Sequence, residues 1–276
     1  MSQANSIFIT GCSSGIGRAS ARAMSQRGWK VFASARKDED LEALAKLRNV
    51  TSVALELKDP KSIEAAAEQV LSATDGKLYA LFNNAGYGQP GAIEDVSPDD
   101  VRAQFEVNVF GGHDLITRIV PHMRRAGRGR IVQCSSVLGF VAAPYRGVYC
   151  ASKFAMEGLT DALRIELRET GIEVVLIEPG PIRSRFVDRS LEVGKATLPL
   201  ETSPHADRYR ELMASLDAGG SETFKLEPDA VATKLIMAVT EPSPRARYYV
   251  TTPTYAAAAM KRALPTRVMD WIAARN

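Results

Sequence analysis

A glycine-rich turn near the start of the chain constrains the fold more than any other stretch. Residues 6–10 are apolar enough to form a short buried strand, and residues 18–26 form a helix, rich in Ala, Met and Ser, that stops at Gly28. The turn between them has glycines at positions 11, 15 and 17. Glycines let the backbone approach a pyrophosphate, and the helix N-terminus offers free N–H groups and a positive dipole end. A glycine turn that only packs a helix on a strand is the alternative, but the strand before it and the helix after it favour a dinucleotide-binding loop.

Apolar strands and helices alternate along the rest of the chain. Strands are expected at residues 6–10, 29–34, 51–57, 78–82, 130–134, 172–177 and 247–250. Helices are expected at residues 18–26, 38–47, 63–71 and 98–122, around Tyr149, and at 228–239. This alternation is typical of a parallel, doubly wound α/β sheet with helices on both faces. Because no repeat, low-complexity run or linker interrupts it, we predict one domain of about seven strands over residues 1–276.

Composition and charge exclude several classes of protein. With 276 residues, of which 45% are hydrophobic, the chain can bury a large core. No apolar run approaches the ~18 residues of a membrane span, and the first strand begins too early for a signal peptide to be expected. Three cysteines without metal-ligand spacing predict no metal site and a reducing, cytoplasmic setting. The net charge is only +3, so the basic cluster at residues 124–130 is interpreted as a solvated helix end and not as a nucleic-acid site.

The end of the second strand predicts which cofactor binds. This end of a βαβ unit faces the adenosine ribose, where an acidic residue would hold the 2′-hydroxyl of NAD. The chain instead has Ala35 followed by Arg36 and Lys37. Because a guanidinium can grip a 2′-phosphate through charge-assisted hydrogen bonds, NADP(H) is favoured. The alternative is that Arg36 is a surface residue before the acidic helix start at Asp38.

Tyr149 and Lys153 are spaced for acid–base chemistry. On a helix, side chains four residues apart lie on one face, one turn apart. A Lys ammonium near a phenol favours the phenolate and so lowers a Tyr pKa that is ordinarily near ~10. The alternative is an aromatic ring packed under the aliphatic stem of a lysine.

Two further polar stretches have both a structural and a functional reading. The fourth strand ends on Asn83, Asn84, Ala85 and Gly86, where small residues would let a cofactor lie against the backbone, or where the Asn pair would form a turn. Asn108 lies among apolar neighbours in the long helix, so its side chain is expected to be hydrogen-bonded, either to backbone or to a catalytic water.

The region after the sixth strand is expected to cover the active site. Tyr209, Leu212, Met213 and Leu216 have the spacing of an amphipathic helix within a lid at about residues 185–225, and a glycine pair at 219–220 would let the chain bend away. That apolar face would either line a substrate pocket or pack on the sheet. His205 is expected to be a surface residue. The helical tail at about residues 255–276 is Ala-rich, is interrupted by Pro265, and is expected to pack against the pocket or a partner subunit.

Five motifs in order make the chain resemble the short-chain dehydrogenase/reductase family over residues 6–184. These are the glycine turn, the Asn-Asn-Ala-Gly segment, Ser136, the Tyr149/Lys153 pair and the segment 179–184. The resemblance implies a Rossmann-type fold, and it implies a catalytic set made of Asn108, Ser136, Tyr149 and Lys153. In this family the Tyr transfers a proton, the Ser binds the substrate oxygen, the Lys tunes the Tyr and holds the nicotinamide ribose, and the Asn holds a water.

The resemblance also implies which residues hold the cofactor. The pyrophosphate is expected at Gly11, Ser13, Ser14, Gly15, Ile16 and Gly17. The adenosine is expected near Arg36, Lys37, Glu56, Leu57, Asn83, Asn84, Ala85 and Gly86, with Glu56 in place of the usual Asp. The nicotinamide is expected near Tyr149, Lys153, Pro179, Gly180, Ile182 and Ser184, with Ser184 in place of the usual Thr.

Three functions remain open from the sequence. The leading one is an NADP(H)-dependent oxidoreductase that interconverts an alcohol and a carbonyl of an apolar small molecule, because the lid and tail resemble those of hydroxysteroid and retinol dehydrogenases. The second is a catalytically idle NADP(H) sensor, and the third is isomerase or dehydratase chemistry on the same fold. Similar proteins form dimers or tetramers through the helices that carry Asn108 and Tyr149, so a homodimer or homotetramer is expected.

Overall fold

Seven parallel strands form one sheet in the computed structural model, which describes residues 5–220 and 222–275. Residues 1–4, 221 and 276, which belong to the predicted domain, its lid and its tail, lie outside the described residues. The strand order is β3-β2-β1-β4-β5-β6-β7. The strands are β1 (Ser6–Ile9), β2 (Lys30–Ala35), β3 (Val50–Ala54), β4 (Ala80–Asn83), β5 (Gly129–Cys134), β6 (Ile172–Glu178) and β7 (Arg247–Tyr249). The predicted doubly wound sheet is confirmed, and its order reverses between β1 and β4, where such sheets bind their ligands.

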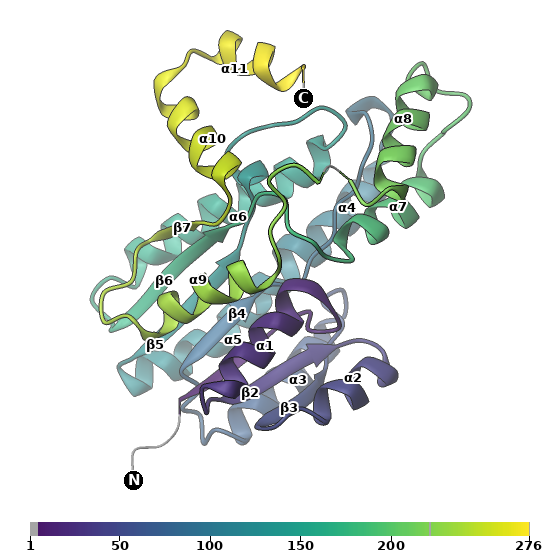
Figure 1. Cartoon of the computed structure of the whole chain (residues 1–276). Coiled ribbons are helices and arrows are strands. Elements are labelled where there is room, and N and C mark those ends of the chain that lie inside the picture. The colour runs from purple at the N-terminus through teal and green to yellow at the C-terminus, as the bar shows by residue number, and fades with distance from the viewer. Residues whose placement is uncertain (1–4, 221, 276) are drawn as a thin grey trace.

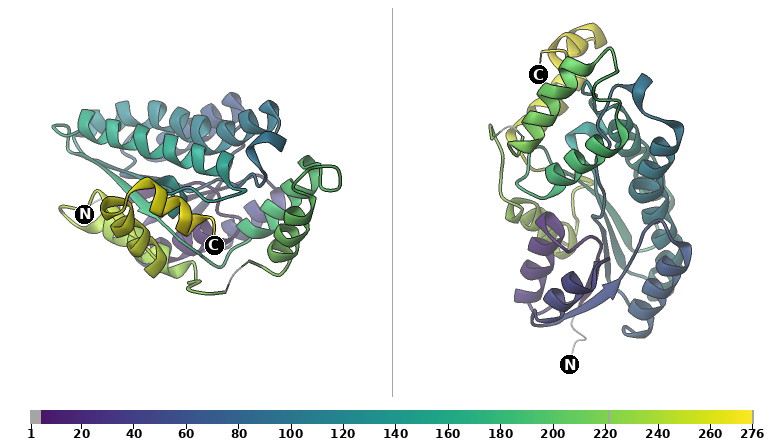
Figure 2. Two further views of the ribbon diagram at one scale, coloured as in Figure 1. Left: turned by 90° about the horizontal axis from the view of Figure 1, so that it is seen from above. Right: turned by 90° about the vertical axis from the view of Figure 1, so that its right-hand side faces the viewer.

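Helices cover both faces of this sheet (Figure 1; Figure 2). One face carries α1 (Gly15–Gln26), α2 (Asp38–Ala45) and α9 (Asp229–Thr240), and the other carries α3 (Pro60–Ser72), α5 (Gly111–Ala126) and α6 (Gly147–Glu166). The sheet has a hydrophobic core on each face, and its strands contribute side chains to both, because successive side chains point to opposite faces. Thus Ile7 and Ile9 pack beneath α1 and α9, while Phe8 between them packs on the other side.

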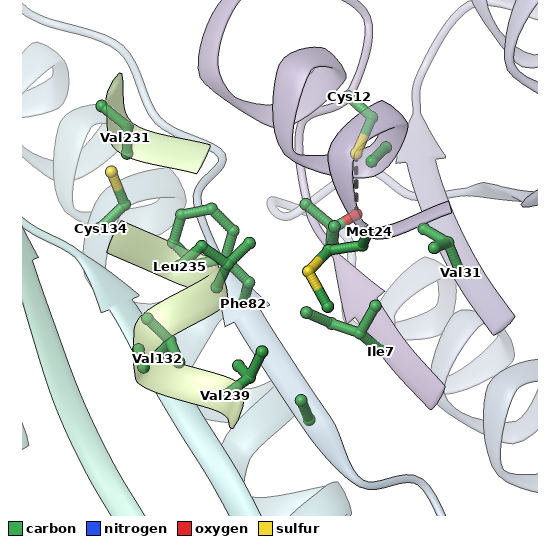
Figure 3. Packing of buried hydrophobic residues seen from close by; sticks show 14 of the residues in the cluster. Ile7, Cys12, Met24, Val31, Phe82, Val132, Cys134, Val231, Leu235 and Val239 are labelled. Carbon is green, nitrogen blue, oxygen red and sulfur yellow. Dashed lines mark hydrogen bonds between the residues drawn. The ribbon is translucent and has the colours of Figure 1, made fainter. Parts of the chain in front are cut away.

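The core under α1 and α9 is built from buried apolar side chains (Figure 3). Met24 of α1 lies beside Ile7, and Leu235 of α9 lies beside Phe82 and Val132 of the two central strands. This packing fixes α1, and therefore the turn before it, against the carboxyl end of the sheet.

The predicted helix at residues 98–122 is confirmed and runs on to Ala126, but it is not a regular α-helix throughout. It divides into α4 (Pro98–Phe105), a π-helical turn η2 (Glu106–Phe110) and α5. Asn108, in that turn, donates from Nδ2 to the Tyr87 carbonyl (3.0 Å) and to Ser152 Oγ (3.1 Å), and its Oδ1 accepts from the Tyr87 N–H (3.1 Å). Such turns break the ordinary helical ladder and occur often at functional sites. Apolar periodicity does not reveal this extra residue, so the sequence predicted a plain helix.

The lid contains one helix more than predicted. The expected amphipathic helix is α8 (Ala206–Asp217), and α7 (Phe186–Thr197) precedes it. Tyr209, Met213 and Leu216 are buried in a small separate cluster with Val96, Val148 and Leu198, so this stripe packs the lid onto the body and does not form a free pocket wall. Gly219 and Gly220 have left-handed backbone (φ 86° and 76°), which bends the chain away after α8.

The tail forms two helices, α10 (Thr252–Ala263) and α11 (Thr266–Ala273), separated at Pro265 as predicted. In Figure 1 they rise from the upper end of the molecule, where α8 also lies. No residue of α11 is buried, and Trp271 is 59% exposed. In the part of the chain that the structure describes, no helix is both long and apolar enough to cross a membrane.

Arg247 of β7 lies at the centre of an ionic cluster that joins α6, β6 and β7. Its guanidinium donates to Glu178 Oε1 (2.5 Å), to Asp161 (2.8 and 2.6 Å) and to Glu157. Glu178 is fully buried, and one oxygen of each Glu has no hydrogen-bond partner among the described residues. Burial, followed by repulsion from Glu157, raises the pKa of Glu178 to about 8, although Arg247 opposes this shift. Burial therefore favours the protonated form of Glu178 in the folded protein.

Replacing Glu178 with Gln is expected to flatten the dependence of stability on pH. A carboxyl whose folded pKa exceeds its unfolded pKa stabilises the fold while protonated, and this contribution is lost as pH rises. Between an unfolded pKa near ~4.3 and the folded value of about 8, this group should lower the free energy of unfolding by roughly 1 kcal/mol per pH unit. Urea denaturation from pH 5 to 8 measures the slope.

The matched control for this experiment is Glu173→Gln, an exposed acid on the same strand. The change in the free energy of unfolding with pH should be the same for Glu173→Gln as for the wild type. In Glu178→Gln, most of the fall in this free energy with rising pH should be lost. Equal slopes in both variants would mean that Glu178 is ionised in the folded protein.

Candidate active site

The glycine turn forms a tight concave loop at the carboxyl end of β1. Gly11 and Gly15 have left-handed backbone (φ 71° and 52°), and a Cβ on Gly17 would lie 2.2 Å from the Gly11 carbonyl oxygen. No acidic residue lies in the first turn of α1, and the Ser14 side chain does not cap it. The free N–H groups of this helix end therefore suit a pyrophosphate. Ile16 faces inward against the core below the loop.

The Asn-Asn-Ala-Gly segment braces this loop. Asn84 Nδ2 donates to the carbonyls of Thr10 (2.9 Å) and Gly11 (3.3 Å), and the backbone N–H groups of Asn84 and Ala85 donate to Thr10 Oγ1 (both 2.9 Å). Asn83 is buried and donates to the Gly112 carbonyl (3.0 Å). Gly86 lies against Asn108, since an added Cβ would be 3.0 Å from its Oδ1. The Asn pair makes the internal hydrogen bonds that the structural reading expected, and the contact of this segment with a cofactor stays a prediction.

The residues predicted to meet the adenosine differ in exposure. The Arg36 side chain is 61% exposed and its Nη1 lies 3.5 Å from Glu56 Oε2. Lys37 is also exposed, near Glu39 (3.4 Å). Leu57 is buried and packs against Gly111, so only its backbone could reach a ligand. Because β3 ends at Ala54, Glu56 and Leu57 lie in the loop beyond the strand.

Tyr149 and Ser136 meet at the end of β5. Tyr149 is buried on α6, and Ser136 hydrogen-bonds to its phenol, which lowers the pKa of Tyr149. Burial has the larger, opposite effect, so the pKa of Tyr149 lies well above its ordinary value and the phenol is protonated. The neighbouring Ser135 is buried with its Oγ unpartnered among the described residues.

Lys153 lies beside Tyr149, and its effect on the Tyr149 pKa stays a prediction. Its Nζ donates to the Cys134 carbonyl (2.7 Å) and lies 5.8 Å from the centroid of the Tyr149 ring. Arg146, in the turn before α6, also lowers the pKa of Tyr149, less strongly than Ser136 does. Burial lowers the pKa of Lys153. Spacing placed Lys153 correctly beside the ring but could not give the direction of its ammonium.

The segment after β6 closes the site over the glycine turn. A Cβ on Gly15 would lie 2.8 Å from Ser184 Cβ, so the two loops are in contact. Gly180 lies against Thr251, Pro179 accepts from the Val137 N–H (2.8 Å), and Ile182 is buried beside Leu226. The predicted nicotinamide segment, residues 179–184, thus lies between the glycine turn and the start of the tail.

Several residues of the site were not singled out by motifs. The Phe186 ring packs on Tyr149 with centroids 5.4 Å apart, and Arg185 Nη2 donates to the Ser13 carbonyl (3.1 Å). Both belong to the lid, and their place directly after Ser184 was the available signal. His205, expected on the surface, is partly buried and contacts Glu94 Oε1 (2.5 Å).

Comparison with known proteins agrees with this geometry. Residues 5–192 match the family model described as short chain dehydrogenase. The uncharacterized oxidoreductase YbbO of Escherichia coli (strain K12) is 43% identical over 267 residues, which cover 97% of this chain and 93% of the relative. The NADPH-dependent 3-dehydrocapnine reductase of Ornithobacterium rhinotracheale is 34% identical over 274 residues (96% and 94%). Human 17-beta-hydroxysteroid dehydrogenase type 1 is 32% identical over 259 residues (89% and 77%).

Solved structures show the same architecture. A short-chain dehydrogenase from Streptomyces avermitilis has a TM-score of 0.81 at 27% identity, covering 98% of this chain and 97% of the other. A short chain dehydrogenase/reductase from Burkholderia phymatum in complex with NAD has a TM-score of 0.78 at 28% identity (94% and 92%). An actinorhodin polyketide ketoreductase variant with NADPH has a TM-score of 0.74 at 25% identity (90% and 95%). The chain therefore belongs to the short chain dehydrogenase family and is an oxidoreductase that uses a nicotinamide cofactor.

Proposed function

We propose that this protein is an NADP(H)-dependent oxidoreductase that interconverts an alcohol and a ketone or aldehyde, with Tyr149 as the proton donor and acceptor. The observation that carries the proposal is the buried, protonated Tyr149 hydroxyl held by Ser136 beside Lys153. A carbonyl oxygen placed between the two hydroxyls would accept hydrogen bonds from both.

Each residue of this set has a defined task in the reaction. The bound cofactor would supply or accept the hydride at the substrate carbon. In the reducing direction Tyr149 Oη gives its proton to the oxygen, and Ser136 Oγ donates a second hydrogen bond to the developing alkoxide. Lys153 would hold the nicotinamide ribose. The Asn108 side chain hydrogen-bonds to Tyr87 and Ser152, so we assign it the role of holding α6 against the segment after β4.

The preference for NADP(H) is proposed from the charge at the adenosine end. Arg36 and Lys37 follow β2, and Glu56 is the one ion-pair partner of Arg36 within the part of the chain that the structure describes, so its guanidinium is available to a 2′-phosphate. The relative named as NADPH-dependent, which matches almost the whole chain, supports the same choice.

Phe186 against Tyr149 supports an apolar substrate, because the ring forms an apolar wall beside the reacting oxygen. Phe110 and Phe154 are 51% and 42% exposed on the helical layer formed with α5 and α6, which supports the proposed homodimer or homotetramer. The three cysteines are free and buried, as suits the proposed cytoplasmic setting.

Replacing Tyr149 with Phe is expected to abolish turnover while NADPH still binds. The change removes the only proposed proton donor and keeps the ring, so the rate should fall by at least ~100-fold. NADPH oxidation is followed with a panel of aliphatic aldehydes, quinones, steroid ketones and retinal, and NADPH binding is followed by fluorescence. Tyr79→Phe, at the opposite end of the sheet, is the matched control and should behave as the wild type.

Other outcomes of this experiment identify the competing functions. Wild-type protein that binds NADPH but oxidises it with no member of the panel would favour the NADP(H) sensor. Product formed without net NADPH consumption would point to isomerase or dehydratase chemistry.

Replacing Arg36 with Leu is expected to raise the KM for NADPH by about tenfold or more and to leave the KM for NADH nearly unchanged. A charge-assisted contact contributes ~1.5–3 kcal/mol, and only NADPH has the 2′-phosphate that would receive it. Steady-state kinetics with both cofactors measure the change. Arg22→Leu, another exposed arginine in an ion pair, is the control. An unchanged cofactor preference would contradict the role of Arg36.

A further inference from the structure

Arg146 lies near the catalytic tyrosine, although it belongs to none of the motifs. It is the residue directly before α6, three positions ahead of Tyr149, and its own backbone is not helical (φ −128°, ψ 12°). Its carbonyl accepts from the Cys150 N–H (2.8 Å), so Arg146 begins the first turn of α6. Its charge interacts with Tyr149, which also contacts Ser136 and Phe186, so we place the guanidinium on the active-site side of α6.

The backbone around Arg146 is fixed on both sides. Arg146 pairs with Gly91 in a short parallel bridge, and the Gly91 N–H donates to the Tyr145 carbonyl (2.9 Å). Tyr145 has a left-handed backbone (φ 57°), and its ring packs edge-on against Tyr209 of the lid (6.1 Å). A Cβ on Gly147 would lie 2.7 Å from the side chain of Ile93. The arginine is therefore held in place between the lid and the catalytic helix.

No counterion of its guanidinium lies among the described residues. Within residues 5–220 and 222–275, Arg146 makes no side-chain hydrogen bond and no ion pair, although it is partly buried. The titratable groups that interact with it are Tyr149 and Cys150, and both are uncharged at neutral pH because burial raises the pKa of each. By contrast, the lid arginines Arg189, Arg208 and Arg210 all contact carboxylates. A partly buried, unpaired guanidinium is costly unless something else binds to it.

We propose that Arg146 binds an anionic group of the substrate, so that the preferred substrates are oxo acids with an apolar chain. This inference rests on the proposed function and names the substrate class for that site. A guanidinium binds a carboxylate or another oxyanion through two parallel hydrogen bonds. Because Arg146 lies one turn before Tyr149, the anion would lie close to the carbonyl carbon and the apolar chain would lie against Phe186.

Matched substrates test the proposal. NADPH oxidation is measured with 2-, 3- and 4-oxodecanoate and with the methyl ester of each, for the wild type, Arg146→Leu and Arg146→Lys. For at least one acid, wild-type kcat/KM should exceed that of its ester by about tenfold or more. Arg146→Leu should remove this advantage, so that kcat/KM falls about tenfold more for the acid than for its ester, whose turnover also changes because this cation acts on Tyr149. Arg146→Lys should keep part of the advantage, since an ammonium retains the charge but not the fork.

Arg210→Leu is the matched control, because Arg210 is an exposed lid arginine paired with Asp207. It should preserve the acid-to-ester ratio. Thermal unfolding and NADPH binding report whether each variant is folded. If Arg146→Leu does not fold, the comparison is made with Arg146→Lys.

Two results would overturn the proposal. One is a wild-type enzyme with no preference for any acid over its ester. The other is an equal fall for acids and esters in Arg146→Leu together with an upward shift of the pH profile, which would make Arg146 a counterion of the Tyr149 phenolate. If no carbonyl is reduced at all, the proposed function fails separately. Calorimetric titration of decanoate into the NADPH complex then tests the anion site. Decanoate binding to the wild type that is lost in Arg146→Leu supports the site, and equal binding to both proteins overturns it.

Discussion

The close approach of Gly17 to the Gly11 carbonyl is the contact on which the rest of the site depends. It lets α1 start directly above the carboxyl end of β1, where Asn84 reaches back to the same carbonyl. Ser184 and Arg185, which follow β6 in the other half of the sheet, contact this turn at Gly15 and Ser13. A side chain at position 17 would separate α1 from the strand and so remove both the anion site and the surface on which the lid rests.

The fold could be predicted almost completely, because its determinants are local. Alternating apolar strands and helices gave all seven strands, since a buried parallel strand is a short run of β-branched and aliphatic residues whatever its neighbours. Two features escaped. Helix α7 has no wide apolar stripe, and only three of its residues are buried. The π turn at Asn108 depends on a partner, Ser152, that is 44 residues away in sequence.

The sequence predicted which residues meet at the site, but it predicted their pKa values only in part. Spacing brings Ser136, Tyr149 and Lys153 together because each follows from the end of a strand or a turn of helix. Burial mainly sets the pKa of Tyr149, and Ser136 and, less strongly, Arg146 oppose its effect; these contacts depend on how the segment around Gly91 and the lid pack. The acid cluster around Arg247 is a similar case, since its members come from three elements.

The π turn also has a consequence for how length changes in this helix would act. It places one more residue between α4 and α5 than an unbroken helix would, and each residue advances a helix by roughly 100°. Winding the same residues as an ordinary helix would rotate all of α5 by roughly 100° about its own axis, whereas deleting one residue at 106–110 would restore an ordinary helix and keep the phase of α5. In the rotated helix the apolar side, with Leu115, Ile119 and Met123, would turn away from the sheet. The turn thus fixes the phase of a long core helix, so one additional backbone unit, and not the apolar pattern alone, decides which side of α5 enters the core.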